Sequence, residues 1–246
     1  MEASLFIHEI FPSFQGEGIL VGVPQVFVRL SGCNLRCSYC DTPESRERVE
    51  GCAVYGWEGE RETLANPLGA AEVAGLVSSL WDAGMHSLSL TGGEPLLQAA
   101  GLEALLPAFK REGVPVYLET NGTLVDALDG VLPWLDHVAM DIKLPSSQGG
   151  EDLTERQRDF LARMPPGRVF LKMVIGVETG DGEAEVACRA LGEPAIAETL
   201  VLQPATPREG SQAISSGRAH ELYSIARRFF ADVRVIPQAH RAWGVR

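Results

Sequence analysis

The chain has 246 residues, a formal net charge of −12, 45% hydrophobic residues and 22% charged residues. These ordinary globular proportions exclude collagen-like, disordered and disulfide-scaffold proteins, and the length suits one core, so we expect a single domain over residues 1–246. The acidic balance argues against general nucleic-acid binding because an acidic surface repels phosphates, although a local basic pocket remains compatible with it.

The sequence shows no recognisable membrane span or secretory leader. No run approaches the roughly 18 apolar residues of a transmembrane helix. Residues 1–22 lack the cationic start, apolar middle and small-residue cleavage site of a signal peptide. We therefore expect no membrane partner and a cytoplasmic location, where clustered cysteines stay reduced and more often bind metals or act as redox groups than form bridges.

The first part of the chain predicts two strands joined by a glycine-rich loop. Residues 5–11 form a strand-like apolar run and lead into residues 12–18, whose two glycines let backbone approach a ligand, although a plain turn has the same pattern. Residues 24–30 predict a β-branched strand that ends just before three clustered cysteines. Residues 43–67 are polar and lack a clear period, so we interpret them as a variable surface excursion.

The rest of the chain alternates between helical and strand patterns. Helical spacing of apolar residues predicts helices at about residues 73–80, 102–109, 153–163, 182–191 and 217–230. Short apolar runs predict strands at residues 87–90, 114–118, 137–140, 169–175, 199–202 and 233–236, followed by a tail at 237–246. This alternation implies right-handed βαβ units, so the polar residues that follow the strands should meet on one rim, where ligands bind.

Three of the five cysteines, Cys33, Cys37 and Cys40, fall within eight residues just after the second predicted strand. Three thiolates reach one compact centre from such a loop and leave one metal position open. Cys188 belongs to a predicted helix and is interpreted as a small buried hydrophobe, whereas Cys52 could supply a fourth ligand to a structural zinc. Spacing alone does not separate zinc from an iron–sulfur cluster.

Two motifs carry a resemblance that favours the cluster. Residues 33–40, with the three cysteines and an aromatic residue before the last, are similar to the CxxxCxxC signature of the radical S-adenosylmethionine (SAM) superfamily. Residues 91–95, Thr-Gly-Gly-Glu-Pro, resemble the motif with which that superfamily binds the amino group of SAM. The resemblance implies a partial (β/α)6 TIM-like α/β barrel, reduced in helices, and a [4Fe–4S] cluster held by Cys33, Cys37 and Cys40. A cluster iron without a protein ligand would chelate SAM and cleave it reductively to a 5′-deoxyadenosyl radical.

Four further segments narrow the resemblance to the 7-carboxy-7-deazaguanine synthases: residues 10–18, 40–42, 119–122 and 237–246. Such enzymes are carbon–nitrogen lyases that convert 6-carboxy-5,6,7,8-tetrahydropterin to 7-carboxy-7-deazaguanine with loss of ammonia, on the route to queuosine and other 7-deazapurines. The SAM-derived radical carries the chemistry, so no side chain is assigned as catalytic. An electron donor such as flavodoxin or ferredoxin and a homodimer are implied as well.

The resemblance also assigns residues to ligands. For SAM it implies Tyr39, Gly93, Glu94, Asn121, Asp141, Ile142, Lys143, Gln203 and Pro204. For the pterin it implies Phe14, Gln15, Gly16, Glu17, Arg29, Thr91, His240 and Arg246, with Arg29 matching a position that pairs with the substrate carboxylate. For Mg²⁺ it implies the hydroxyl of Thr42, which could instead close a local turn.

Two other functions fit part of the pattern. A glycyl-radical-enzyme activase of the same superfamily would share the cysteines and the glycine-rich motif, and the Asp141–Lys143 pair also suits it, but it would act on a large protein. A non-enzymatic zinc-binding adaptor would explain the cysteines alone. The glycine-rich loop at residues 14–18 and the tail at residues 240–246 argue against both.

Overall fold

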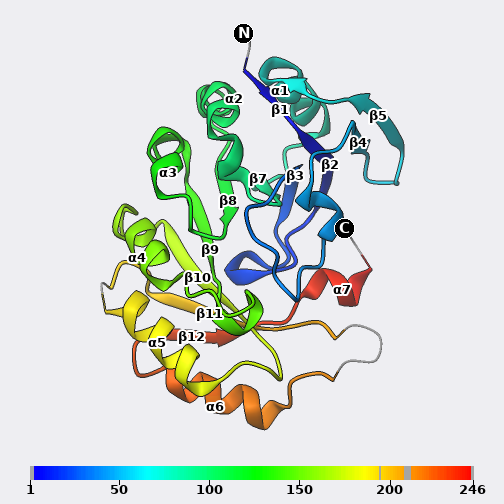
Figure 1. Cartoon of the computed structure of the whole chain (residues 1–246). Helices are drawn as coiled ribbons and strands as arrows, with labels where there is room; N and C mark the ends of the chain where they lie inside the picture. The colour runs from blue at the N-terminus through cyan, green and yellow to red at the C-terminus, as the bar shows by residue number, and fades with distance from the viewer. Residues whose placement is uncertain (1–2, 194, 208–211, 245–246) are drawn as a thin grey trace.

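The structure is a computed structural model and describes residues 3–193, 195–207 and 212–244. Its centre is a ten-stranded sheet in the order β12-β11-β10-β9-β8-β7-β3-β2-β4-β5 (Figure 1). Neighbouring strands run parallel from β3 to β12. These strands are β3 (Pro24–Leu30), β7 (Ser87–Gly92), β8 (Val116–Thr120), β9 (His137–Ile142), β10 (Val169–Ile175), β11 (Thr199–Pro204) and β12 (Asp232–Val235).

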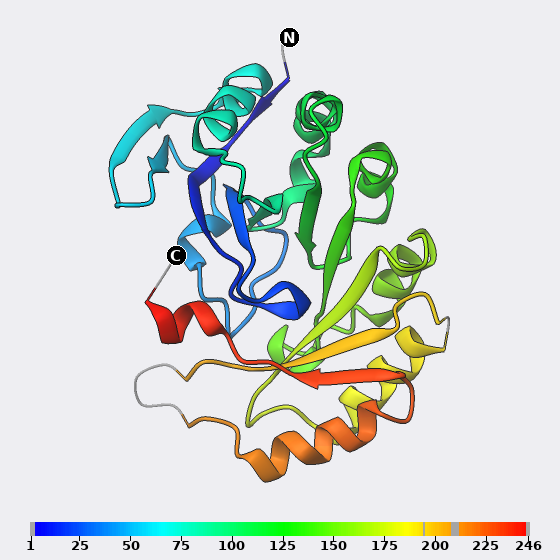
Figure 2. The same cartoon turned by 180° about the vertical axis from the view of Figure 1, so that it is seen from behind.

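One helix connects each parallel strand to the next, and the helices lie on the outer face of the curved sheet (Figures 1 and 2). They are α1 (Ala70–Leu80), α2 (Ala99–Arg111), α3 (Val125–Val131), α4 (Thr154–Ala162), α5 (Asp181–Gly192) and α6 (Ser216–Ala226). These strand–helix units form an open partial barrel with fewer helices than a complete one has. The predicted partial (β/α)6 barrel is confirmed.

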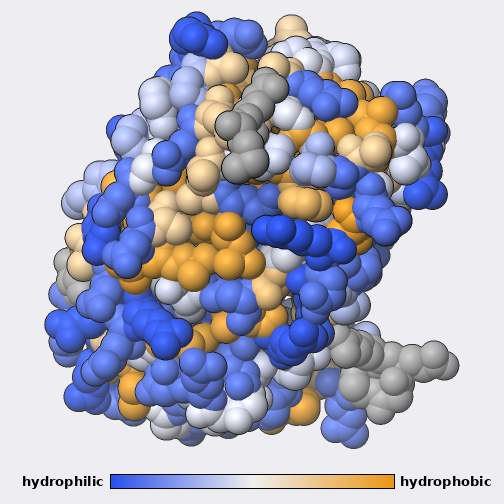
Figure 3. Space-filling model, turned by 45° about the horizontal axis from the view of Figure 1, so that its top comes forward, coloured by the Kyte–Doolittle hydropathy of each residue, from blue (hydrophilic) through white to orange (hydrophobic). Residues whose placement is uncertain are grey.

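Period-two alternation divides the side chains of each parallel strand between two faces. In β3, Val26, Val28 and Leu30 pack in the large core beneath the helices, whereas Gln25 and Phe27 point to the inside of the barrel. Burying one such apolar side chain contributes about 1.5–3 kcal/mol, so the helix side supplies most of the stability. The inner face is therefore left for polar side chains. Figure 3 shows a mainly polar surface in which apolar side chains form smaller areas.

The N-terminal strand is longer than predicted. β2 (Ile7–Phe14) runs antiparallel to β3, preceded by β1 (Ser4–Leu5), which pairs with β6 (Leu68–Gly69). Residues 12–14, expected in the glycine-rich loop, belong to the strand because their backbones pair with residues 24–26. The loop therefore begins at Gln15, after which a short 3₁₀ turn (Gly18–Leu20) leads to β3.

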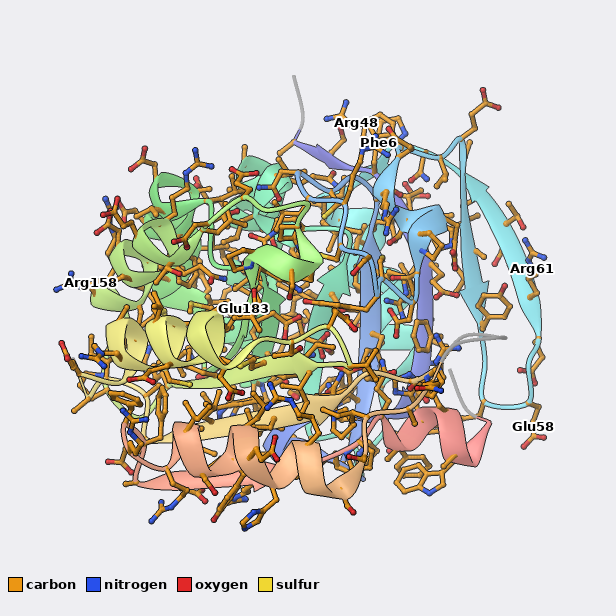
Figure 4. All side chains as sticks on the ribbon, turned by 60° about the horizontal axis from the view of Figure 1, so that its bottom comes forward. Phe6, Arg48, Glu58, Arg61, Arg158 and Glu183 are labelled. Atoms are coloured by element: carbon orange, nitrogen blue, oxygen red, sulfur yellow. The ribbon has the colours of Figure 1, made fainter. Side chains whose placement is uncertain are left out.

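The interpretation of residues 43–67 as a surface loop is wrong. A 3₁₀ turn (Pro43–Arg46) is followed by β4 (Gly51–Tyr55) and β5 (Arg61–Ala65), an antiparallel hairpin that extends the sheet beyond β2. The hairpin was missed because β5 is an exposed edge strand without an apolar face. Figure 4 shows Glu58 and Arg61 at its outer edge.

Three smaller differences concern helices. No helix was predicted between residues 120 and 137, yet α3 forms there with Leu128 and Val131 buried. The last predicted helix ends at Ala226, four residues short of the predicted Phe230. The tail contains α7 (Ala239–Trp243), too short to show an apolar stripe. Among the described helices, none has the length and apolar character needed to cross a membrane.

Candidate active site

A cavity of about 180 Å³ lies at the carboxyl ends of the parallel strands. The predicted rim of polar strand ends is therefore present as one cavity. Of the predicted site residues, it is lined by Phe14, Gln15, Gly16, Glu17, Arg29, Cys33, Cys37, Tyr39, Cys40, Thr42, Thr91, Gly93, Glu94, Asn121, Asp141, Lys143, Gln203 and His240.

The cysteine loop forms one wall of this cavity. Cys33, Cys37 and Cys40 line it together, and none of the three is in a disulfide. The loop is held in place by the 3₁₀ turn behind it, since Cys33 N donates to Arg46 O (2.9 Å) and the Arg46 guanidinium donates to Cys37 O (2.8 Å). Burial raises the pKa of the Cys33 thiol, and a bound metal would favour its thiolate form. Three thiols of one loop that line the same cavity fit an iron–sulfur cluster with one iron left open.

The other two cysteines do not face the cavity. Cys52 lies in β4, fully buried in the core with α1, and Cys188 lies in α5, 1% exposed. Burial raises the pKa of each thiol to about 12. The prediction for Cys188 is confirmed. The zinc alternative loses its fourth ligand because Cys52 packs in the core beneath the helices.

Gly93 allows the backbone after β7 to lie in direct contact with the cysteine loop. A Cβ at this position would lie 2.0 Å from the carbonyl oxygen of Gly32 and 2.9 Å from that of Ser45. Any larger residue would push the loop after β7 away from the cysteines. The glycine of this motif is thus required by backbone packing, whatever it contacts in a ligand.

Glu94 and Asn121 tie three loops together. The Glu94 carboxylate accepts hydrogen bonds from Asn121 N (2.8 Å), Thr120 Oγ1 (2.8 Å) and Leu96 N (3.1 Å), although burial still raises its pKa. Asn121 Nδ2 donates to the Asn34 side chain in the cysteine loop (2.9 Å). These bonds hold the ends of β7 and β8 against the cysteines.

Asp141 and Lys143 project from the end of β9 beside Tyr39. Lys143 Nζ pairs with Asp141 Oδ2 (3.0 Å), donates to the Tyr39 hydroxyl (3.3 Å) and lies 5.3 Å from the centre of its ring. Burial raises the pKa of Tyr39 to about 12, so the hydroxyl stays protonated at neutral pH. The arrangement links the strand end to the residue between the last two cysteines.

Lys172 is a buried cation that sequence analysis missed. Its ammonium, 6% exposed, contacts Glu17 Oε2 and lies 3.2 Å from Asp141 Oδ1. It therefore joins the glycine-rich loop to the end of β9. The signal was present as a single charged residue in the otherwise apolar strand VFLKMVI.

Ionisation of Glu17 should make the stability of the fold depend on pH in the acid range. Burial alone would raise its pKa, but Lys172 and Gln238 lower it from 4.5 to about 2. Because the folded pKa is the lower one, the carboxylate stabilises the fold above pH 4.5, and this contribution is lost as the pH falls towards 2. The free energy of unfolding, measured by denaturant titration, should fall across that window, and Glu17→Gln should flatten the fall. The exposed Glu58→Gln variant is the control. A slope unchanged by Glu17→Gln would contradict this.

Glu119 is a second missed residue, although it stands in the Glu-Thr-Asn-Gly segment noted at a strand end. Its carboxylate accepts hydrogen bonds from Thr91 Oγ1 (2.8 Å) and Gln15 Nε2 (3.0 Å). Burial raises its pKa, while Lys172 favours the charged form. Thr91 and Gln15, both predicted to contact the substrate, thus also hold this carboxylate in the cavity.

The tail packs onto the glycine-rich loop. Ala239 N donates to Gly16 O (2.8 Å), and a Cβ on Gly16 would lie 2.3 Å from His240 Nδ1. Gln238 Nε2 donates to Glu17 Oε1 (2.7 Å) and to Asp41 Oδ2 (2.9 Å), next to the last cysteine. Gly16 is required for this contact, and Gln238, which lies in the 237–246 segment but was not assigned a role, joins three segments.

The hydrogen-bond partners of Arg29 and Thr42 are relevant to the ligands predicted for these residues. Arg29 lines the cavity, and its Nε pairs with the Glu9 carboxylate (2.9 Å). Thr42 precedes the 3₁₀ turn, and its carbonyl, not its hydroxyl, accepts from Ser45 N (3.0 Å). The side chain does not cap that turn.

Two predicted residues do not line the cavity, and a third is not among the described residues. Ile142 is 1% exposed and packs in the core beneath the helices, because it alternates with Asp141 along β9, so only its main chain could reach a ligand. Pro204 ends β11 outside the cavity lining. Arg246 lies outside the described residues.

Comparison with known proteins identifies the family. Residues 27–169 match the radical SAM superfamily. The 7-carboxy-7-deazaguanine synthase of Geobacter sulfurreducens is 42% identical over 97% of this chain and 96% of its own. The chain belongs to this family. The synthase of Methanopyrus kandleri is 39% identical over 96% of this chain and 92% of its own.

Solved structures with lower identity share the fold. The crystal structure of QueE from Escherichia coli has a TM-score of 0.62 at 22% identity and covers 96% of this chain and 95% of its own. A radical SAM methyltransferase from Sphaerobacter thermophilus has a TM-score of 0.59 at 18% identity, with 87% and 66% covered. The family prediction made from the cysteine and glycine motifs is confirmed, and membership implies a [4Fe–4S] cluster and SAM.

Proposed function

We propose that the chain converts 6-carboxy-5,6,7,8-tetrahydropterin to 7-carboxy-7-deazaguanine with release of ammonia, as a radical SAM carbon–nitrogen lyase. The observation that carries this proposal is a single cavity walled by the three cysteines on one side and by the glycine-rich loop and tail on the other. The first wall suits the radical-generating cofactor. At the second, the tail packs directly on Gly16, and this part of the cavity would hold the pterin.

Cys33, Cys37 and Cys40 would hold the cluster. Gly93, Glu94, Asn121, Asp141, Lys143, Gln203 and Tyr39 would bind or frame SAM, with main-chain contacts from Ile142 and Pro204. When bound and reduced, the cluster and SAM would supply a 5′-deoxyadenosyl radical for reversible hydrogen-atom transfer with the substrate. The buried Oε1 of Gln203, which has no hydrogen-bond partner among the described residues, supports a polar ligand at this wall.

For the substrate, Arg29 would bind the carboxylate through its planar fork, and Phe14, Gly16, Glu17, Thr91 and His240 would shape the rest of the pocket, with Arg246 beyond the described residues. Thr42 would bind Mg²⁺ through its hydroxyl, an oxygen ligand of the kind this cation prefers. The absence of a side-chain cap from Thr42 supports that use. Gln15 would act mainly through Glu119.

The remaining expectations are also proposals. We expect one domain over residues 1–246, in which the 43–67 segment extends the sheet and the tail at 237–246 completes the pocket. We expect a homodimer that receives electrons from a flavodoxin- or ferredoxin-like donor. A cytoplasmic location fits cysteines that form no disulfide among the described residues, since thiols stay reduced in that compartment.

The test is an anaerobic assay of the reconstituted protein with SAM, a reductant, Mg²⁺ and the carboxytetrahydropterin. Product should appear as 7-carboxy-7-deazaguanine in a chromatogram, with ammonia released in equal amount and SAM consumed much more slowly than product forms. Cleavage of SAM without the deazaguanine would refute this activity while keeping the superfamily, as expected of an activase that acts on a protein. Omitting Mg²⁺ tests the metal separately and should slow product formation.

A further inference from the structure

A chain of buried polar side chains runs through the barrel away from the cavity. Gln15 Nε2 donates to Gln25 Oε1 (3.0 Å), and Gln25 Nε2 donates to Ser87 Oγ (2.7 Å). Ser87 Oγ lies 3.0 Å from His86 Nδ1, which can accept its hydrogen. Gln25 and Ser87 are fully buried at the first residues of β3 and β7, where barrels ordinarily pack apolar side chains.

At the end nearest the cavity, this series of hydrogen bonds reaches the Glu119 carboxylate. Gln15 has two amide hydrogens, and both are used: one bonds to Gln25 and the other to Glu119 Oε1 (3.0 Å). Its oxygen accepts from Glu17 N (3.0 Å). Gln15 is therefore a connector between Gln25 and Glu119, and its amide has no hydrogen left to donate to a substrate.

The order of donors and acceptors is set by Gln15 and continues through Gln25 to Ser87. If the Gln25 amide were turned over, its two hydrogens would face the Gln15 nitrogen, which is itself a donor. Ser87 completes this order, because its hydroxyl can accept from Gln25 Nε2 and give its hydrogen to His86. Gln15 thus donates to Glu119 at one end, and towards the other end Gln15 donates to Gln25, Gln25 to Ser87 and Ser87 to His86.

We propose that Gln25 and Ser87 are positioning residues that act through Gln15 to fix Glu119 for binding of the pterin substrate. The inference rests on the proposed function, which supplies the substrate. Neither residue touches the cavity, so neither is assigned a contact with substrate. Their effect is on the orientation of a buried carboxylate and therefore on recognition, not on generation of the radical.

Ser89 offers a matched control for Ser87. It is also a serine of β7, it lies two residues further along on the same inner face, and it is equally buried. Its hydroxyl has no hydrogen-bond partner among the described residues, and it does not line the cavity. Ser87→Ala and Ser89→Ala therefore remove the same atom in similar surroundings, but only the first breaks the chain.

The experiment measures steady-state KM and kcat for the pterin in the reconstituted enzyme, along with cluster content and SAM cleavage without substrate. Ser87→Ala should raise KM about tenfold, the usual effect of losing one buried hydrogen bond, while Ser89→Ala keeps the native value. Cluster content and substrate-free SAM cleavage should stay native in both. Because Ser87 acts through Gln25, adding Ser87→Ala to Gln25→Met should not raise KM further.

Failure of the proposed function and failure of the positioning role give different results. If the native enzyme makes no deazaguanine, the proposed function fails. If it makes deazaguanine but Ser87→Ala and Ser89→Ala have equal KM values, the positioning role is refuted. Parallel loss of melting temperature, cluster content and SAM cleavage in Ser87→Ala would refute it too, since that pattern marks general destabilisation. Additive effects of Ser87→Ala and Gln25→Met would show that the two residues do not act in series.

Discussion

Alanine at Cys33, Cys37 or Cys40 should remove the iron–sulfur cluster and abolish deazaguanine formation. The three thiols line one wall of the cavity, and each would supply one of three protein ligands to the cluster. Two remaining thiolates hold a cluster poorly, and without it SAM receives no electron, so activity should fall to background. The measurements are the visible absorbance and iron content of the reconstituted protein, followed by the product assay.

Cys188→Ala is the control for this series. It removes a thiol of similar size from α5, where Cys188 is 1% exposed and packs among apolar residues. The variant should keep the cluster and most of the activity, with only a small loss of stability from the vacated space. Loss of the cluster in Cys188→Ala, or its full retention in Cys37→Ala, would show that the ligand assignment is wrong.

The sequence predicted the parts of the site that depend on local pattern. Cys33, Cys37 and Cys40 lie within one loop, and residues 91–95 form another, so their spacing is visible in the sequence. Strand ends were found because apolar runs stop at polar residues, and the right-handed rule for parallel strands brings those ends together. The sequence did not show which face of β9 each residue takes: Ile142 has its side chain in the core because it alternates with Asp141, so its predicted contact with SAM would come from the main chain.

What the sequence did not predict are partners distant in the chain. Lys172 and Glu17 are 155 residues apart, and Gln238 lies 221 residues from Glu17, so no local pattern connects them. The hairpin of β4 and β5 was missed for a different reason. Its outer strand is exposed and polar, and its inner strand is recognised only through pairing with β2. Both kinds of feature follow from tertiary contacts instead of periodicity.

Replacing Lys172 with methionine should lower the free energy of unfolding more than the same change at any other lysine of a described ion pair. The ammonium is 6% exposed and faces Glu17 and Asp141, and Glu119 adds a third negative charge nearby. These opposing charges keep the pKa of Lys172 well above its usual value despite burial. Removing it leaves buried carboxylates without their cation, which typically costs about 3–5 kcal/mol. The free energy of unfolding from denaturant titration measures this loss.

A surface lysine shows whether burial is the cause. Lys110 pairs with Asp136 at 2.8 Å, but its side chain is 44% exposed, so Lys110→Met should cost at most about 1 kcal/mol. Lys172→Arg keeps the charge and should retain more stability than Lys172→Met. If Lys172→Met lowered the free energy of unfolding no more than Lys110→Met, the prediction would be wrong. The buried carboxylates would then have to be stabilised by water or by protons that they take up. Because Glu17 belongs to the glycine-rich loop and Asp141 to the end of β9, a large cost would instead mean that one buried cation holds these two segments together.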